Sequence, residues 1–266
     1  MSEISLKTLK KLNQKKYRDE YGLFFAEGEK LINDIPETYI AEFLLSAHYA
    51  KTRPDFEKNT NIPVRVLSDG VFLLLTGAKT PQGRIALCKK PKFKPFGSLC
   101  AKKPANRAKR AFDAPPLFVL LDRVQDPANV GAIARLSHAC GVSTLFLSNG
   151  CADLFGQKAV AAAAASIFFT PSQTNADLLQ TAALIKQTGA DVYAAAPNAR
   201  KTFYEADFKA PCAFILGSEG RGVSNELLSQ ARQTLCIPMP GGGASLNVST
   251  ACAALLYEAL RQRLFA

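Results

Sequence analysis

The chain has 266 residues, of which 48% are hydrophobic, and it carries a formal net charge of +11. This hydrophobic content is ample for a folded core, no apolar run approaches the ~20 residues of a membrane span, and the first residues lack a secretory signal. Seven irregularly spaced cysteines and two histidines far apart argue against a disulfide framework and a histidine-rich metal site. We therefore expect a cytoplasmic protein with reduced thiols, no metal and no membrane segment.

The first 88 residues predict a small α/β domain. Leu6, Leu9 and Leu12 form a helical stripe with lysines on its outer face. A strand that runs into a helix is expected from Phe24 onward. A short helix or buried run follows at residues 71–75, and further strands are expected at residues 39–46, 64–67 and 84–88.

Most of the excess charge lies between residues 89 and 115, which hold nine Lys or Arg, one Asp and four prolines. Such a composition cannot bury a core, so we predict a linker between domains at residues 1–88 and 116–266. The linker allows two interpretations. It is a flexible arm for nucleic-acid phosphates, with Phe93 and Phe96 available to stack on bases, or it is a tether that its charge keeps solvated.

Strands and helices alternate from residue 116 onward, which predicts an α/β fold with a mainly parallel sheet covered on both faces. The expected strands are residues 117–121, 144–147, 167–170, 191–195, 213–216 and 234–237. The expected helices are residues 129–140, 158–165, 175–188, 225–230 and 246–263. Ligand sites of open α/β sheets lie at the carboxyl ends of such strands.

Three segments place small and polar residues beside a buried strand, at residues 122–135, 214–223 and 237–251. Glycines in the second and third segments allow the backbone to approach a ligand closely. Either loop taken alone is better explained as a tight turn. Neither has the Gly-Lys-Ser/Thr of a phosphate loop or the spacing of the dinucleotide fingerprint, which argues against a nucleotide-dependent oxidoreductase.

Together the three segments closely resemble the three motifs of the SpoU/TrmH group of RNA ribose 2'-O-methyltransferases, in the SPOUT class. The residues that carry them are Asp126, Pro127, Asn129, Gly131, Arg135 and Gly141; Leu216, Gly217, Glu219, Gly220 and Gly222; and residues 237–239 and 245–249. The resemblance spans roughly residues 117–263. A weaker resemblance to the N-terminal RNA-binding domain of the group covers residues 10–16, 25–28 and 80–83. The chain departs from the group between the first two motifs, where five alanines follow Lys158-Ala-Val in place of a Ser/Gly-Ala-rich patch.

The resemblance implies a C-terminal SPOUT-type parallel sheet with a trefoil knot, a small α/β N-terminal RNA-binding domain and a homodimer. It implies S-adenosylmethionine as cofactor, held near Leu216, Gly217, Ile237, Met239 and Leu246. The methyl group would pass to a ribose 2'-hydroxyl, in ribosomal RNA rather than transfer RNA. The polar site positions of the group match Asn129, Arg135, Glu219, Ser245 and Asn247.

Several of these residues allow a second interpretation. Arg135 is drawn as the general base in mechanisms for the group, but a guanidinium is effectively always protonated, so binding the phosphate beside the target ribose fits equally well. Glu219 orients Arg135, acts on the proton or only contacts loop amides. Ser245 and Asn247 also fit as N-caps of the last helix. The apolar stripe of that helix fits a dimer interface or an internal core, through Val248, Cys252, Leu255, Leu256 and Ala259.

Two other functions stay open at this point. One is a transfer-RNA 2'-O-methyltransferase, which shares the chemistry and differs in substrate. The other is a non-catalytic RNA-binding or assembly protein, against which the intact set of polar site positions argues.

Overall fold

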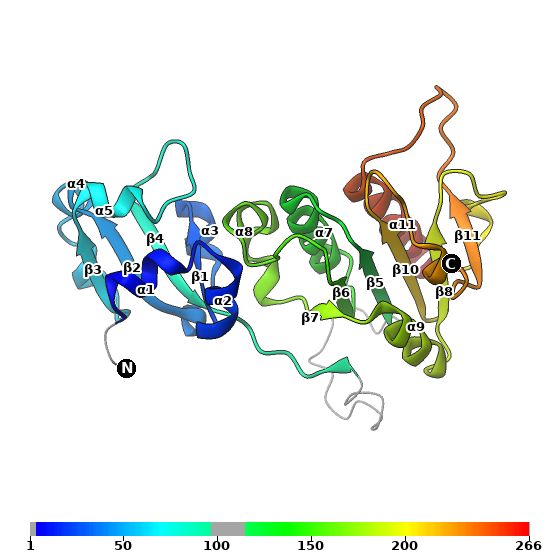
Figure 1. Ribbon diagram of the computed structural model, residues 1–266, viewed down its shortest axis with the longest axis horizontal. Coiled ribbons are helices and arrows are strands. Elements are labelled where there is room, and N and C mark those ends of the chain that lie inside the picture. Colours follow the sequence, from blue (N-terminus) through cyan, green and yellow to red (C-terminus); the bar gives the residue numbers. More distant parts are fainter. Residues whose placement is uncertain (1–3, 97–114, 266) are drawn as a thin grey trace.

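Two β-sheets lie side by side along the longest axis of the molecule, a four-stranded sheet and a seven-stranded sheet (Figure 1). The computed structural model describes residues 4–96 and 115–265. The four-stranded sheet is built from the N-terminal residues and the seven-stranded sheet from the C-terminal residues. In Figure 1 the helices α7 and α8 lie between the two sheets.

The N-terminal sheet has the strand order β1-β4-β2-β3. Strand β4 pairs antiparallel with β1 and β2, while β3 pairs parallel with β2. The strands are β1 (Leu23–Glu27), β2 (Ile40–Ser46), β3 (Val64–Leu67) and β4 (Arg84–Lys89), which confirms the expected strands. The helices are α1 (Leu6–Lys11), α2 (Lys15–Tyr21), α3 (Glu29–Asp34), α4 (Ala47–Thr52) and α5 (Asp69–Leu73).

The C-terminal sheet is parallel throughout, with the strand order β7-β6-β5-β10-β8-β11-β9. The strands are β5 (Leu117–Asp122), β6 (Thr144–Ser148), β7 (Ser172–Ala176), β8 (Asp191–Ala195), β9 (Lys201–Thr202), β10 (Cys212–Gly217) and β11 (Gln233–Cys236). The helices are α7 (Pro127–Ala139), α8 (Gln157–Ala163), α9 (Leu178–Gln187), α10 (Asn225–Leu228) and α11 (Val248–Leu264). The expected α/β fold with a parallel sheet is confirmed.

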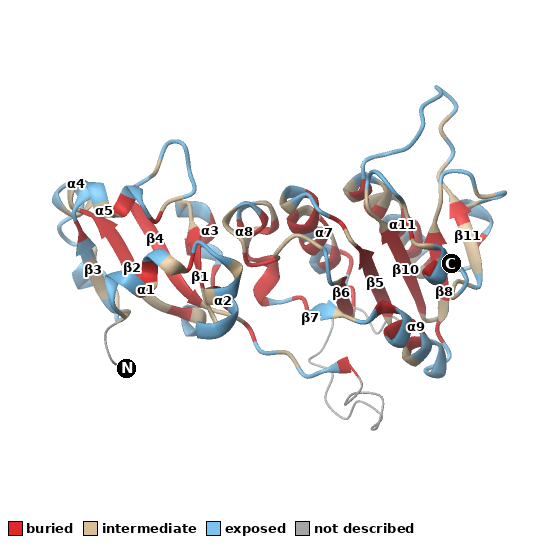
Figure 2. Cartoon of the chain, viewed as in Figure 1, coloured by how far each residue is buried: buried red, intermediate tan, exposed pale blue. Residues whose placement is uncertain are grey.

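Both faces of the parallel sheet are covered, so β5 is buried along its whole length and β10 along all but its last residue (Figure 2). Alternate residues of β5 point to opposite faces. Val119 packs in the core that α7 and α11 cover, and Leu120 packs in the core that α9 covers. The stripe of α11 is used in the first of these cores, because Val248, Cys252, Leu255, Leu256 and Ala259 are all buried within the single chain. The interpretation of this stripe as a dimer interface is therefore wrong.

One expected strand in the middle of the chain is wrong, and one expected helix begins later than predicted. Residues 167–170 do not form a strand; Ala164–Phe168 is a 3-10 helix and the strand comes later, as β7. The apolar run is buried for another reason, since the ring of Phe168 packs on Phe24 and Tyr39 with centroid separations of 5.7 and 5.0 Å. The helix expected from residue 175 begins instead at Leu178, where the Asp177 carboxylate accepts hydrogen bonds from the first turn.

The two sheets share one continuous hydrophobic core, which contains Phe24 from β1 and Val130 from α7. Polar contacts reinforce this contact surface. The Arg18 guanidinium on α2 donates to the Asp153 carboxylate at 2.6 and 2.8 Å. The Gln157 amide at the start of α8 donates to the Leu75 carbonyl at 2.7 Å. The N-terminal residues are thus packed on the C-terminal sheet as well as connected to it through the chain.

The described part of the basic segment, residues 89–96, does contribute to a core. Phe96 is 7% exposed and packs edge-on against Phe118 and Phe146, with ring centroids 5.1 and 5.5 Å apart. The expectation that Phe96 is free to stack on bases is wrong, because burying its ring in this aromatic cluster removes apolar surface from water. Phe93 stays partly exposed. The other basic residues of the segment, Lys102, Lys103, Arg107, Lys109 and Arg110, lie outside the described residues.

Four cysteines, Cys88, Cys140, Cys212 and Cys252, are buried as free thiols, as expected for small core residues. Burial raises the pKa of the Cys140 thiol to about 11 and that of the Cys212 thiol to about 12. Cys100 lies outside the described residues. None of the helices within residues 4–96 and 115–265 combines the length and the apolar character that a membrane crossing requires.

Candidate active site

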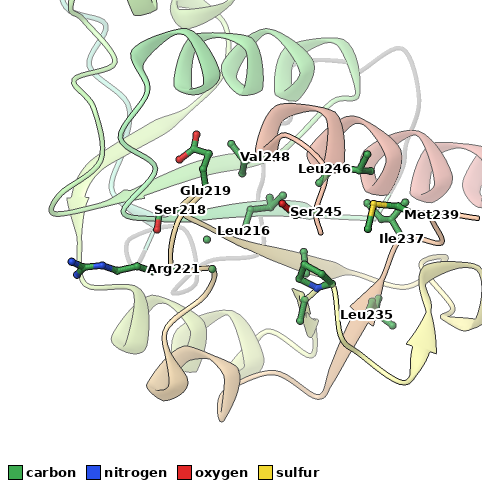
Figure 3. Close-up of a pocket in the computed structure, with 16 residues that line it drawn as sticks. Leu216, Ser218, Glu219, Arg221, Leu235, Ile237, Met239, Ser245, Leu246 and Val248 are labelled. Carbon is green, nitrogen blue, oxygen red and sulfur yellow. The ribbon is translucent and has the colours of Figure 1, made fainter. Parts of the chain in front are cut away.

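A cavity of about 290 Å³ opens at the carboxyl ends of β8, β10 and β11 (Figure 3). These strands are neighbours in the parallel sheet, so their carboxyl ends meet at one edge. Two loops face each other across the cavity, the second-motif loop (residues 217–223) and the third-motif loop (residues 237–247). The wall includes all five residues expected at the cofactor, namely Leu216, Gly217, Ile237, Met239 and Leu246.

The cavity wall also contains residues that the sequence reasoning missed. Ala195 ends β8, and Ala196 and Pro197 follow it directly. The others are Ser218, Arg221, Leu235, Val248 and Ala251. A signal for the first three exists in the sequence, because small residues stand at the end of the strand expected at 191–195 and directly after it. The signal for Val248 and Ala251 is weaker, since nothing in the sequence tells which turn of the last helix reaches the cavity.

Most of the wall is apolar, and Ile237, Met239 and Leu246 gather on one side of it (Figure 3). Glu219 and Ser245 supply polar groups. Arg221 also lines the cavity, but its side chain points away from the other lining residues (Figure 3). The cavity therefore suits a ligand with a flat or apolar body and a few polar groups.

Gly217 ends β10 at a point where the second-motif loop folds back on the strand. A Cβ atom added there would lie 1.9 Å from the Gly222 carbonyl carbon and 2.1 Å from the Val223 nitrogen. The Gly222 amide donates to the Ser218 carbonyl at 2.8 Å, and Gly222 has a positive φ of 65°. Only glycine leaves room for this turn, which lays the backbone of the loop along the cavity wall.

Asn129 links the three motifs through its side chain. Its Nδ2 donates to the Glu219 carboxylate at 2.5 Å, and its Oδ1 accepts from the Asn247 amide at 3.0 Å. Asn129 is buried on the first turns of α7, whereas Glu219 and Asn247 are exposed loop residues. One fixed amide thus holds two exposed polar side chains at the same edge of the sheet.

Asn247 has a second role as the N-cap of α11. Its Oδ1 accepts hydrogen bonds from the Ser249 amide at 2.8 Å and the Thr250 amide at 3.4 Å. Ser245 lies two residues before this cap, in the cavity wall, so the N-cap interpretation is wrong for Ser245. The helix itself begins at Val248, which leaves Leu246 in the loop.

Arg135 stands apart from this group. It lies on α7, six residues after Asn129, and its side chain is exposed. It is absent from the cavity wall, and within residues 4–96 and 115–265 no hydrogen bond or ion pair holds its guanidinium. Glu219 is held by Asn129 and not by Arg135, so the expectation that Glu219 orients Arg135 is wrong within a single chain.

Asp122 fixes the strand end from which the first motif starts. It is 4% exposed, and its carboxylate accepts from the Arg123 guanidinium at 2.7 and 2.8 Å and from the Ser224 amide at 2.9 Å. Burial alone would raise the pKa of Asp122, but these hydrogen bonds outweigh it and lower the pKa. The charged carboxylate therefore ties β5 to the residues that follow the second-motif loop.

Gly131 of the first motif allows α7 and α8 to touch. A Cβ atom added at Gly131 would lie 2.2 Å from the Ala159 carbonyl oxygen and 2.7 Å from the Ala162 Cβ. The alanine-rich stretch that departs from the group's pattern therefore supplies the small residues that this close packing needs. At the end of α8, Ala164 adopts φ 52° and ψ −147°, a conformation that L-residues rarely take.

Comparisons with known proteins agree with this geometry. The model of the SpoU rRNA Methylase family matches residues 116–257, and the model of the MRM3-like substrate binding domain matches residues 4–86. The chain is 31% identical to the 23S rRNA (guanosine(2553)-2'-O)-methyltransferase RlmP of Bacillus subtilis, over 95% of this chain and 94% of that protein.

Solved structures give the same picture. The AdoMet-bound rRNA methyltransferase from Sinorhizobium meliloti is 26% identical, with a TM-score of 0.77 over 98% of this chain and 95% of that chain. The SpoU methyltransferase AviRb from Streptomyces viridochromogenes, in complex with AdoMet, has the same fold, with a TM-score of 0.81 over 98% of both chains at 21% identity. The family match covers more than half of the chain, and this protein therefore belongs to the SpoU rRNA methylase family.

Proposed function

We propose that this enzyme transfers a methyl group from S-adenosylmethionine to a ribose 2'-hydroxyl of ribosomal RNA. Its family and its similarity to rRNA 2'-O-methyltransferases over nearly the whole chain support this function. The observation that carries the proposal is the cavity between the second-motif and third-motif loops, beside the side chains of Asn129, Glu219 and Asn247.

The cavity fits S-adenosylmethionine. The apolar side of the wall at Ile237, Met239 and Leu246 can receive the adenine, and the glycine turn at Gly217 exposes main-chain groups for its polar atoms. When bound, the cofactor supplies a methyl group on a sulfonium, whose sulfur leaves as the neutral thioether of S-adenosylhomocysteine. The protein then has to position the ribose hydroxyl and manage one proton.

We assign these two tasks, positioning the hydroxyl and managing the proton, to different polar residues. The Glu219 carboxylate, held by Asn129, lies in the cavity wall and takes or orients the hydroxyl proton. The Ser245 hydroxyl lies in the opposite loop and orients the ribose. A guanidinium is a cation without an acceptor atom, so we assign Arg135 to the phosphate beside the target ribose, where its charge polarises the hydroxyl.

We further propose a homodimer in which Arg135 reaches the cavity of the partner chain. The support is that Arg135 is exposed and lies outside the cavity of its own chain. We also propose that the chain forms a trefoil knot where it returns from β11 to α11. Helix α11 packs on α7 and β10. Within this proposal, residues 1–88 bind the RNA, residues 89–115 form the basic connection and residues 116–266 carry the reaction. A ribosomal RNA substrate would locate the enzyme in the cytoplasm.

The direct test incubates the purified protein and labelled S-adenosylmethionine with unmodified ribosomal RNA or with transfer RNA. The RNA is then digested to nucleosides, and 2'-O-methylated nucleosides are measured by mass spectrometry. The proposal expects methyl transfer to ribosomal RNA. Transfer to transfer RNA alone would support the alternative substrate, and RNA binding without transfer to either would support a non-catalytic assembly protein.

A further inference from the structure

Helices α1 and α2 carry an unusual excess of positive charge outside the cavity. They hold five lysines and one arginine against two acidic residues. Lys7, Lys10 and Lys16 are exposed and Lys11 is partly exposed, and within the described residues none of the four pairs with a carboxylate. The acid Asp19, in contrast, is already neutralised by Lys15 at 2.7 Å and Lys90 at 2.5 Å. Four lysines are thus left free to meet negative charge from outside.

An aromatic pair lies among these lysines. The rings of Tyr17 and Tyr21 stack with centroids 6.4 Å apart and an angle of 16° between their planes. The Lys11 and Lys16 ammonium groups lie 4.9 and 5.8 Å from the centre of the Tyr17 ring. Tyr21 is 40% exposed, although it is a large aromatic residue on a surface helix. Neither ring is needed in the core of this sheet, which Leu9, Leu12 and other residues fill.

The position of this surface relative to the cavity is fixed. Arg18, between Tyr17 and Asp19 on α2, is buried and binds Asp153, whose loop follows β6. In the same loop the Ala152 amide donates to the Val124 carbonyl at 2.8 Å. Strands β5 and β6 are neighbours, so this loop lies at the carboxyl edge of the sheet where the cavity opens. A ligand bound on α2 can therefore extend along that edge to the cavity.

We propose that Lys7, Lys10, Lys11, Lys16, Tyr17 and Tyr21, the α1–α2 basic surface, bind a single-stranded stretch of the substrate RNA. The lysines neutralise phosphates, and an unpaired base stacks on the Tyr21 ring. Unpaired charge next to an exposed aromatic ring is the chemistry by which proteins hold single-stranded RNA. The ion pair between Arg18 and Asp153 is a positioning contact that keeps this RNA at a set distance from the cavity. The inference rests on the proposed RNA substrate and assigns a surface to its binding.

The test compares three variants with the wild type on protein-free ribosomal RNA from cells that lack the gene. The first variant replaces Lys10, Lys11 and Lys16 by Gln, the second is Tyr21→Leu, and the third is a control with the same change of charge. The control replaces Lys51, Lys201 and Lys209, three exposed lysines elsewhere on the molecule, by Gln. RNA affinity is measured over a range of salt concentrations, together with KM, kcat, S-adenosylmethionine affinity and melting temperature.

The lysine variant should lower the slope of log affinity against log salt by about two, because each lost phosphate contact removes roughly 0.7 to 0.9. Tyr21→Leu should weaken RNA binding about tenfold with an unchanged salt slope, because stacking does not release counterions. In both variants KM for RNA should rise while kcat, cofactor affinity and melting temperature stay near the wild-type values. The control should keep the wild-type salt slope.

Equal salt slopes in the lysine variant and the control would overturn the proposal. The binding measurement is repeated with assembled ribosomal particles. A loss of binding that appears only with these particles would also overturn the proposal, since that result would assign the surface to a protein partner. The proposed function is contradicted by a different result, namely that the wild-type protein transfers no methyl group to any RNA in the same assay.

Discussion

Asn129 on α7 donates a hydrogen bond of 2.5 Å to the carboxylate of Glu219, which lies 90 residues further along the chain. The Asn129 side chain is 7% exposed. Its Oδ1 accepts a second hydrogen bond, of 3.0 Å, from the Asn247 side-chain amide. Each partner sits in a different loop at the edge where the cavity opens. The two hydrogen bonds of Asn129 therefore hold side chains from three separate stretches of sequence in one fixed arrangement.

Replacing Asn129 by Ala should release both partners without touching the cavity wall. We expect turnover to fall between about tenfold and a hundredfold, because misplacing reactive groups by a fraction of an ångström to an ångström has effects of that size. The dissociation constant for S-adenosylmethionine should change less than about twofold. Steady-state kinetics and calorimetry measure the two quantities. Asn59→Ala, at an exposed asparagine in a short 3-10 helix (Glu57–Asn59) between β2 and β3, is the control. Wild-type turnover in Asn129→Ala would remove the bond from the mechanism.

The glycine turn gives a matched pair of variants. Gly217→Ala places a methyl group within 2.2 Å of three backbone atoms of Gly222 and Val223, so the loop must move and cofactor binding should be lost. Gly220→Ala, three residues away in the same loop, meets nothing within 4 Å and should bind S-adenosylmethionine like the wild type. Calorimetry with S-adenosylhomocysteine measures the affinity of the cofactor site in both variants. Tight binding by Gly217→Ala would mean that this turn does not form the cofactor site.

Arg135→Ala should abolish methyl transfer and leave cofactor affinity nearly unchanged, because Arg135 is outside the cavity wall. If Arg135 acts in the partner chain, mixing Arg135→Ala with Glu219→Ala should recover activity from two inactive proteins. Random exchange of subunits would restore about a quarter of the wild-type sites. No recovery after mixing, together with light scattering at the mass of a single chain, would contradict the dimeric site.

The backbone at Ala164 predicts a gain of stability. A non-glycine residue in such a conformation costs roughly 1–3 kcal/mol, and glycine removes most of that strain. Ala164→Gly should therefore stabilise the protein by about 1 kcal/mol, which raises the melting temperature by about 2–4 °C in a chain of this size. The neighbouring Ala163→Gly, at the end of α8 with an ordinary φ of −73°, should destabilise by up to about 1 kcal/mol. A lower melting temperature in both variants would show that Ala164 is not strained.

The sequence predicted the parallel sheet well, since its central strands are buried on both faces and appear as apolar runs between turns. Residues 191–195 form β8 with the expected bounds. The same signal failed at residues 167–170, where the ring of Phe168 packs on Phe24 of the N-terminal sheet. It also failed at Phe96, whose basic and proline-rich surroundings conceal a buried aromatic ring. Local composition cannot reveal contacts with distant parts of the chain.

In the candidate site, too, the local features could be predicted from the sequence and the contacts between distant residues could not. The glycine loops and the residues expected at the cofactor lie around one cavity, because each follows a strand of the same sheet. Which polar side chains would pair could not be predicted, since Glu219 was expected beside Arg135 or loop amides and the fold places Asn129 against it instead. The separation of Arg135 from the cavity depends on the direction in which its side chain leaves α7, and the sequence spacing of six residues does not determine that direction relative to the loops.

The most direct measurement is a map of 2'-O-methyl sites in total RNA from cells with and without the gene. Ribosomal RNA from the deletion strain should lose methylation at one or a few sites, and the wild-type gene should restore it. The Arg135→Ala gene should not restore it, although the protein is present and binds the cofactor. An identical map with and without the gene would contradict the assignment as an RNA ribose 2'-O-methyltransferase, and a loss confined to transfer RNA would contradict the assigned substrate.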